Sequence, residues 1–187
     1  MHYLIVPGYT GSGPDHWQTH LANTYAGFSR VVQDDWRKPD ADVWTARLDE
    51  TIRDIDDDVF LIGHSCGSVT VAQWAATHYD QRVVGAVLVA PADVDASRAL
   101  PAIRPQGPLP QGALALKTHL VVSDNDPHLS LPRALTLART WGSTVETIAG
   151  GGHLNSSSGF GQWDHIVTVI ENQSGRRLET AVGRAYR

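Results

Sequence analysis

Short apolar runs alternate with segments of helical spacing along most of the chain. Six runs rich in Val, Ile and Leu predict strands, at residues 2–7, 29–33, 58–63, 82–90, 116–123 and 144–149. Their near-continuous apolar character is typical of strands buried on both faces, and the helical segments between most of them favour a parallel sheet with helices on each side. The pattern therefore predicts an α/β fold with about six mainly parallel strands and helices on both faces.

Five segments between these runs have the three- and four-residue spacing of amphipathic helices. We place these helices at residues 15–25, 40–55, 65–79, 131–141 and 160–172. In the second helix, an apolar stripe that includes Val43, Trp44, Leu48 and Ile52 is expected to face the sheet. Residues 94–115 hold four prolines and two glycines, so we expect a loop there and no cap domain over the sheet.

The size of the chain and its apolar content are those of one domain. With 187 residues, 42% of them hydrophobic, the chain can bury one full core. We expect residues 1–173 to form a single domain. Residues 174–187 are polar and predict a C-terminal tail that is either frayed or ends in a weakly packed helix.

Charge and cysteine content exclude several classes of protein. The 15 Lys and Arg against 20 Asp and Glu give a formal charge of -5 without a strong basic stripe, so nucleic acid is not an expected partner. The single cysteine, Cys66, excludes an internal disulfide framework and a multi-cysteine zinc site. The chain opens directly into a strand-like run and its longest apolar stretch is too short to span a bilayer, so we expect a soluble, cytoplasmic protein with no membrane partner.

The third predicted strand ends in a motif that carries chemistry. Gly63 and Gly67 flank His64-Ser65-Cys66, with an apolar strand before them and a helical pattern after them. In G-x-S-x-G the chain turns so sharply from strand to helix that only small residues fit at the flanks, and the serine hydroxyl is exposed at the carboxyl edge of the sheet. Ser65 is thus a candidate nucleophile at a helix N-terminus, where the N–H of Cys66 faces developing negative charge.

A serine hydroxyl is a poor nucleophile near neutral pH, so this motif needs a base and a group that orients it. The expected chain order is serine, acid, histidine, with the partners in loops after later strands. Asp124 and Asp126 follow the fifth strand, and His153 follows the sixth after three glycines. All of them are therefore predicted at the same sheet edge as Ser65. One aspartate orients the histidine, and Asp124 is better suited to capping the loop.

Several segments recur together, in order, in one known family. They are "LIVPGYTGSGPDHW" at the start, "DW" and Pro39 after the second strand, "GHSCGS", the aspartate before a proline in "SDNDPH", and "GGGHLN". Over nearly the whole chain to about residue 173, the sequence resembles the retinoblastoma-binding-protein-9-like, or YdeN-like, small serine hydrolases of the α/β-hydrolase superfamily.

The resemblance implies a compact α/β-hydrolase fold and a role for each motif residue. Ser65 would be the nucleophile, Asp126 the acid and His153 the base, with the backbone N–H groups of Tyr9 and Cys66 as the oxyanion hole. It implies a hydrolase of esters or similar acyl compounds that needs no cofactor. The pocket-protein-binding motif L-x-C-x-E, from which the family takes its name, is missing, so that partner is not transferred.

Other polar residues near these motifs are candidates for lesser roles. His16 and His20 are four residues apart but lack the glutamate of H-E-x-x-H, so no metal site is predicted. His16, Trp17 and His64 are candidates for lining the pocket, or for packing the first helix and the elbow. Cys66 is not the expected nucleophile, because the elbow presents its central residue, Ser65.

Three functions are compatible with these residues. The first is hydrolysis of small-molecule acyl compounds through an acyl-enzyme on Ser65. Acyl transfer or lactone opening would use the same residues. The third is a non-catalytic protein-binding role, since a fold alone does not establish function. The catalytic order of serine, aspartate and histidine favours an enzyme over a binder.

Overall fold

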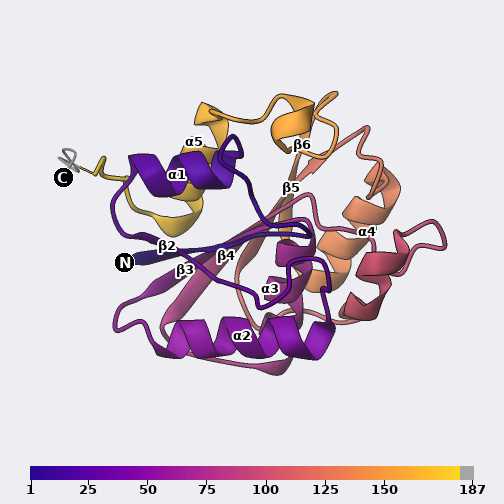
Figure 1. The fold of residues 1–187 in the computed structure, drawn as a ribbon, viewed down its shortest axis with the longest axis horizontal. Helices are drawn as coiled ribbons and strands as arrows, with labels where there is room; N and C mark the ends of the chain where they lie inside the picture. The colour runs from indigo at the N-terminus through magenta and orange to yellow at the C-terminus, as the bar shows by residue number, and fades with distance from the viewer. Residues whose placement is uncertain (182–187) are drawn as a thin grey trace.

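The centre of the molecule is one parallel sheet. The computed structural model describes residues 1–181. Six strands have the order β2-β1-β3-β4-β5-β6 (Figure 1). They are β1 (His2–Val6), β2 (Phe28–Arg30), β3 (Val59–His64), β4 (Val83–Val89), β5 (Thr118–Ser123) and β6 (Thr144–Ile148). All neighbouring pairs are parallel, so the carboxyl ends of all strands meet at one edge, and the predicted fold class is confirmed.

Helices cover both faces of this sheet. The helices are α1 (Trp17–Thr24), α2 (Ala41–Arg53), α3 (Cys66–Thr77), α4 (Leu131–Trp141) and α5 (Asp164–Ser174). In Figure 1, α1 and α5 lie on one side of the sheet, and α2 and α3 lie on the other. Along β1, Leu4 and Val6 pack in the core with α2, α3 and α4, whereas Tyr3 and Ile5 pack with α1 and α5. Because successive strand residues point to opposite faces, a sheet covered twice requires a continuous apolar run.

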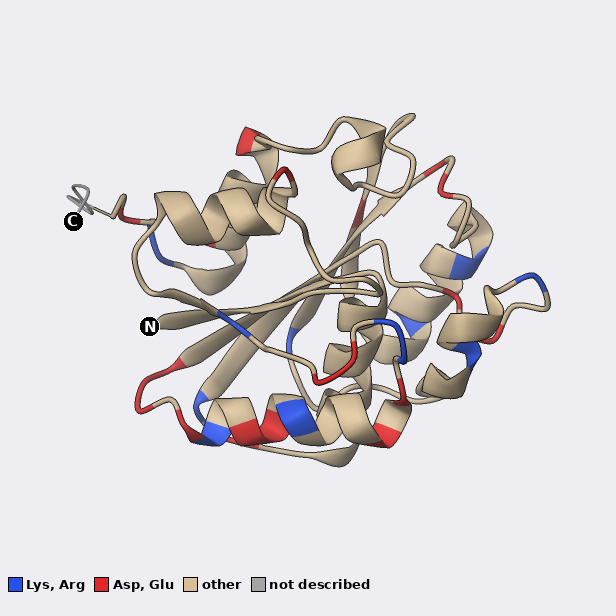
Figure 2. Cartoon of the chain, viewed as in Figure 1, with Lys and Arg blue, Asp and Glu red and all other residues tan. Residues whose placement is uncertain are grey.

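Helix α2 shows why the predicted apolar stripe was too wide. Trp44, Leu48 and Ile52 are buried in the core as expected, but Val43 is 55% exposed. Adjacent helix residues are about 100° apart around the axis, so Val43 points away from the face that carries Trp44. Figure 2 shows both acidic and basic residues along α2. Among them, Arg47 lies 3.4 Å from Glu50.

Two elements differ from the sequence prediction by three residues or more at one end. β2 has only three residues, because the chain leaves the sheet after the N–H of Val31 donates to the Ile5 carbonyl, and Val32 is 65% exposed. α5 begins at Asp164 rather than at residue 160. A 3-10 turn at Ser156–Ser158 comes first, and the N–H of Phe160 closes that turn on the Asn155 carbonyl.

Two segments, the proline-rich one and the C-terminal one, lie mostly outside the main helices and strands. Residues 94–115 contain one short 3-10 helix, η1 (Pro101–Gln106), and the chain has no cap domain within residues 1–181. Of the predicted tail, Ser174 is the last residue of α5, and a later part contacts the end of α1: the Ala26 N–H donates to the Glu179 carbonyl, and the Ala181 N–H donates to the Thr24 carbonyl. Residues 182–187 of the predicted tail lie outside the described part. None of the described helices has the length and apolar character needed to cross a membrane.

Candidate active site

Ser65 lies at the turn between β3 and α3. Its backbone has φ 54° and ψ -122°, a conformation that a residue with a side chain rarely adopts. The flanking glycines make this turn possible through close packing. A Cβ atom on Gly67 would lie 1.9 Å from the Val6 carbonyl oxygen, and one on Gly63 would lie 2.7 Å from the Cα atom of Ser68. Both contacts are too short for any side chain, so the turn requires glycine at these two positions.

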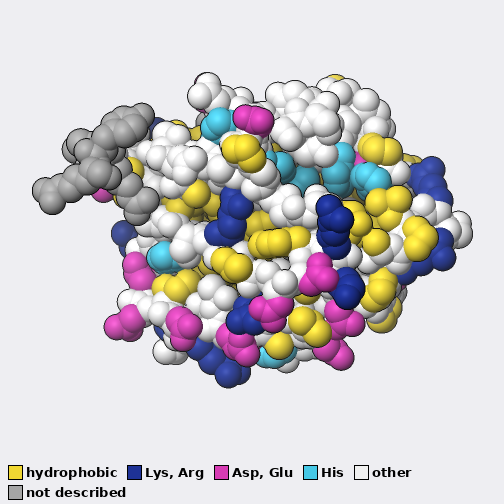
Figure 3. Space-filling view, viewed as in Figure 1, with side chains coloured by type: hydrophobic (Ala, Val, Ile, Leu, Met, Phe, Trp, Pro, Cys, Tyr) yellow, Lys and Arg dark blue, Asp and Glu magenta, His cyan; other side chains and the backbone are white. Residues whose placement is uncertain are grey.

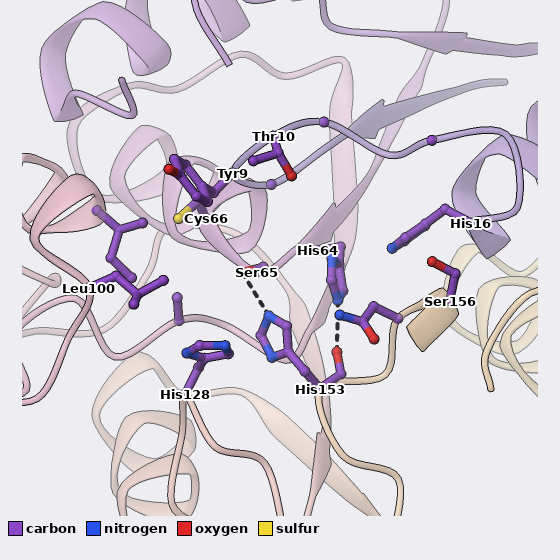
Figure 4. Close-up of a pocket in the computed structure, with 16 residues that line it drawn as sticks. Tyr9, Thr10, His16, His64, Ser65, Cys66, Leu100, His128, His153 and Ser156 are labelled. Carbon is purple, nitrogen blue, oxygen red and sulfur yellow. Dashed lines mark hydrogen bonds between the residues drawn. The ribbon is translucent and has the colours of Figure 1, made fainter. Parts of the chain in front are cut away.

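Ser65, His153 and Asp126 form one hydrogen-bonded chain. His153 Nε2 lies 2.9 Å from Ser65 Oγ (Figure 4). His153 Nδ1 lies 2.9 and 3.0 Å from the two carboxylate oxygens of Asp126. An ionised carboxylate only accepts, so Nδ1 carries the proton and Nε2 is free to accept the serine O–H. The Asp126 side chain is 1% exposed, which shields this contact from water. The structure thus brings together the three residues to which the sequence assigned catalysis.

The loop after β5, which carries Asp126, binds the glycine-rich loop after β6, which carries His153. Asp124 Oδ1 accepts the Gly150 N–H at 2.7 Å, and Asn125 Oδ1 accepts the Gly152 N–H at 2.6 Å. Asp124 therefore links the two loops, and it is Asp126 that reaches the imidazole. The role of Asn125 was missed from the sequence, since its only signal was its place between two candidate acids.

His64 supports the same loop from beneath the elbow. Its Nε2 lies 2.9 Å from the carbonyl oxygen of His153. A carbonyl only accepts, so His64 donates from Nε2. Burial, together with the nearby His153 and His16, holds the pKa of His64 well below its usual value, so its ring is neutral. His64 both lines the cavity and links the end of β3 to the base.

The two backbone N–H groups that the resemblance implies for an oxyanion hole belong to Tyr9 and Cys66, which line the same cavity as Ser65. The N–H groups of Tyr9 and Cys66 donate to no oxygen within residues 1–181. The chain at Gly8 lies so close to the elbow that a Cβ atom there would be 2.8 Å from the His64 carbonyl oxygen and 3.3 Å from the Cys66 nitrogen. This approach places the loop after β1 beside the start of α3. Burial raises the pKa of the Cys66 thiol to about 12, so the thiol stays protonated near neutral pH.

Gln106 fixes the first turn of α3 from the proline-rich segment. Its side chain is fully buried, and its Nε2 donates to the Cys66 carbonyl at 2.8 Å and to Thr70 Oγ1 at 2.9 Å. Gln73 in turn donates to the Gln106 carbonyl. Although this segment has no sequence signal beyond its prolines, these contacts make it part of the wall around the elbow.

A cavity of about 450 Å³ opens in front of Ser65. Its wall includes four histidines, His16, His64, His128 and His153. Figure 3 shows histidine side chains gathered in the upper half of the visible face. His128 was not predicted; its ring centroid lies 4.6 Å from that of His153, and its N–H donates to Asp126 at 2.8 Å. Burial and the neighbouring His153 lower the pKa of His128.

Trp17 does not line this cavity. It is 1% exposed and its Nε1 donates to the Leu154 carbonyl at 2.9 Å, so it ties α1 to the loop of His153. His16 does line the cavity, and its Nδ1 accepts the N–H of Gln18 at the start of α1. No group of three or more possible metal ligands is found among residues 1–181.

This geometry can be compared with known proteins. The family model described as "Serine hydrolase" matches residues 3–172, which is most of the chain. The chain belongs to the serine hydrolase family. The enzyme is therefore a hydrolase with the α/β-hydrolase fold, as the motif resemblance implied. A comparison with curated proteins gave no match.

Several solved structures have a similar fold. The chain is 27% identical to a YdeN-like hydrolase from Pectobacterium atrosepticum, with a TM-score of 0.84 over 93% of this chain and 90% of that one. It is 17% identical to the ydeN gene product of B. subtilis, with a TM-score of 0.73 over 94% and 99% of the two chains. Est1E from Butyrivibrio proteoclasticus, solved with ferulic acid bound, shares 12% identity and a TM-score of 0.65 over 93% and 89%.

Proposed function

We propose that this hydrolase cleaves esters or related acyl compounds of small molecules through an acyl-enzyme on Ser65. The observation that carries the proposal is the hydrogen-bonded chain from Asp126 through His153 to Ser65, which ends at the mouth of a cavity. A serine hydroxyl becomes a useful nucleophile only beside such an oriented base. The residues of the chain supply all the groups that this mechanism needs, so no cofactor is invoked.

In the first half of the reaction, Ser65 Oγ attacks the carbonyl carbon of the substrate. His153 Nε2, at 2.9 Å, takes the serine proton, and Asp126 stabilises the imidazolium that forms. The N–H groups of Tyr9 and Cys66 bind the negative oxygen of the tetrahedral intermediate. The intermediate collapses when the bond to the leaving group breaks and His153 returns the proton to that group.

In the second half, a water molecule attacks the acyl-enzyme. His153 takes a proton from this water, the same two N–H groups bind the oxyanion again, and the proton returns to Ser65 Oγ as the acid product leaves. An alcohol in place of the water would give acyl transfer, and a cyclic ester would give lactone opening. These reactions require the same residues, and the measured products distinguish them.

Labelling with a fluorophosphonate probe tests the proposal directly. The folded wild type is expected to form a covalent adduct that maps to the peptide of Ser65, and Ser65→Ala is expected to form none. Hydrolysis of p-nitrophenyl acetate is expected to fall by about 10³-fold or more in Ser65→Ala, because the triad acts as a unit. A wild type that is folded by circular dichroism but takes no label would favour the non-catalytic binding role instead.

A further inference from the structure

One polar atom in the wall of the cavity has no partner. His16 is 6% exposed, and its Nδ1 accepts the backbone N–H of Gln18 at 3.2 Å. A backbone N–H can only donate, so Nδ1 carries a lone pair and the neutral ring has its proton on Nε2. Nε2 is buried and has no hydrogen-bond acceptor within the described residues. The fold thus holds a fixed, unused donor in this wall.

The ring that carries the unused donor extends from the edge of the site toward His64 (Figure 4), and the two ring centroids are 4.8 Å apart. An unpaired buried donor lowers stability, so each such group calls for an explanation. Burial, with Arg30 and His153 nearby, lowers the pKa of His16 to about 4. At neutral pH the ring therefore offers a hydrogen bond rather than a positive charge.

The two sides of the cavity differ in polarity. In Figure 4, Leu100 and His128 lie on one side of Ser65, and His16 and Ser156 lie on the other. Ile103, which also lines the cavity, is in the same turn as Leu100, since its N–H donates to the Leu100 carbonyl. The first side therefore presents aliphatic carbon.

The side of His16 holds further donors. Asn155, next to Ser156 in the chain, lines the cavity, and its Oδ1 accepts the Ser158 N–H at 3.0 Å and the Ser157 hydroxyl at 2.8 Å. These bonds fix the carboxamide so that its NH2 group is left to donate. An ester bound at Ser65 extends in two directions from its carbonyl carbon, so its two halves meet the two different sides.

We propose that His16 is a specificity-determining residue, whose Nε2–H donates a hydrogen bond to an oxygen in the leaving group while the acyl chain lies against Leu100 and Ile103. The substrate class is then short acyl esters of alcohols that carry a second oxygen, such as an ether or a hydroxyl. This assignment rests on the proposed function, because it places the carbonyl carbon at Ser65. A site that has a fixed donor rejects an analogue lacking the acceptor.

Two variants of His16 test its two roles separately, the hydrogen-bond donor in the cavity and the N-cap of α1. His16→Asn keeps an oxygen that can accept the Gln18 N–H, since asparagine is a favourable N-cap, but it is too short to donate into the cavity. His16→Gln places an amide N–H at about the reach of Nε2 and gives up the cap. The structure therefore predicts opposite outcomes for selectivity and for stability in the two variants.

The measurement is kcat/KM for 2-methoxyethyl butyrate against n-butyl butyrate, which differ by one oxygen in place of one methylene. The ratio is expected to fall by about five- to tenfold from wild type to His16→Asn, and most of it is expected to return in His16→Gln. Comparing ratios between variants cancels the intrinsic difference between the two alcohols. A second pair, butyl 3-methoxypropanoate and butyl pentanoate, tests the same exchange of a methylene for an oxygen in the acyl half of the substrate.

Three results would overturn the assignment. They are a ratio that is unchanged in His16→Asn, including an equal loss on both butyrates, a ratio that stays low in His16→Gln, and a preference that appears only with oxygen in the acyl half. Fluorophosphonate labelling of wild-type Ser65 is measured alongside. If labelling occurs and selectivity is absent, only the role of His16 is wrong, whereas an unlabelled Ser65 removes the proposed function and this role together.

Discussion

Replacing Asp126 by asparagine should prevent His153 from acting as a base without moving the His153 ring. Asp126 Oδ1 accepts the His128 N–H at 2.8 Å, and Oδ2 lies 2.9 Å from His153 Nδ1. In Asp126→Asn, the carboxamide oxygen keeps the place opposite the His128 N–H, because an NH2 group there would face another donor. The new NH2 group then takes the place of Oδ2, next to His153 Nδ1.

That orientation favours the wrong tautomer of His153, because the NH2 group takes the closer of the two oxygen positions beside Nδ1. An NH2 group only donates, so Nδ1 must accept, and the ring proton moves to Nε2, 2.9 Å from Ser65 Oγ. A protonated Nε2 cannot take the serine proton. We expect kcat to fall by about 10³- to 10⁴-fold, which corresponds to about 4–5.5 kcal/mol in the activation free energy.

Asp124→Asn is the matched control two residues away. Asp124 is exposed and its Oδ1 accepts the Gly150 N–H, a bond that an asparagine oxygen keeps. Its kcat on p-nitrophenyl acetate should stay within about threefold of wild type, because surface changes of this kind have small effects. Both variants are assayed after their unfolding transitions are shown to match the wild type. An Asp126→Asn enzyme within tenfold of wild type, or a larger loss in Asp124→Asn, would refute the assignment of the acid.

The lowered pKa of His16 and the exposure of Leu100 each give a further prediction. The pKa of His16 is about 4 in the fold and ordinarily 6.5, so the unfolded chain binds more protons between these values and stability falls as the pH falls. From pH 8 to pH 5 this group alone should lower the free energy of unfolding by about 2 kcal/mol in urea titrations; an unchanged pH dependence in His16→Asn would contradict it. Leu100 is 44% exposed, so a long acyl chain would stay partly in water and recover less than about 0.8 kcal/mol per methylene. Across p-nitrophenyl esters from acetate to palmitate, kcat/KM should be highest at about two to six carbons, and a maximum at ten or more would show a tunnel that this loop does not form.

The elements that the sequence alone predicted are those with a local physical cause. The central strands of a sheet covered on both faces need mainly apolar residues, so their runs were visible without any tertiary information. The elbow was visible because its strained serine needs glycine on both sides, and those glycines stand at Gly63 and Gly67. Parallel strands also bring their following loops to one edge, which is why the order of Ser65 and His153 along the chain sufficed to place them together.

Tertiary structure alone decided between neighbouring residues of the same kind. Asp124 and Asp126 are two residues apart, and the motif resemblance favoured one, but only the packing shows that Asp126 is buried against His153 while Asp124 binds Gly150. Such choices depend on which way a loop turns, and loop direction is set by distant contacts rather than by local spacing.

The same holds for the partners of His16 and for the wall around the elbow. That the Nδ1 atom of His16 caps α1 while Nε2 stays unpaired depends on where the Gln18 N–H lies in the folded chain. Gln106 reaches the Cys66 carbonyl from forty positions away in sequence, a contact that no spacing rule predicts. Composition and periodicity describe what each segment tends to form, whereas hydrogen-bond partners between segments exist only after the segments have packed, and those partners set the tautomers and the polarity of this cavity.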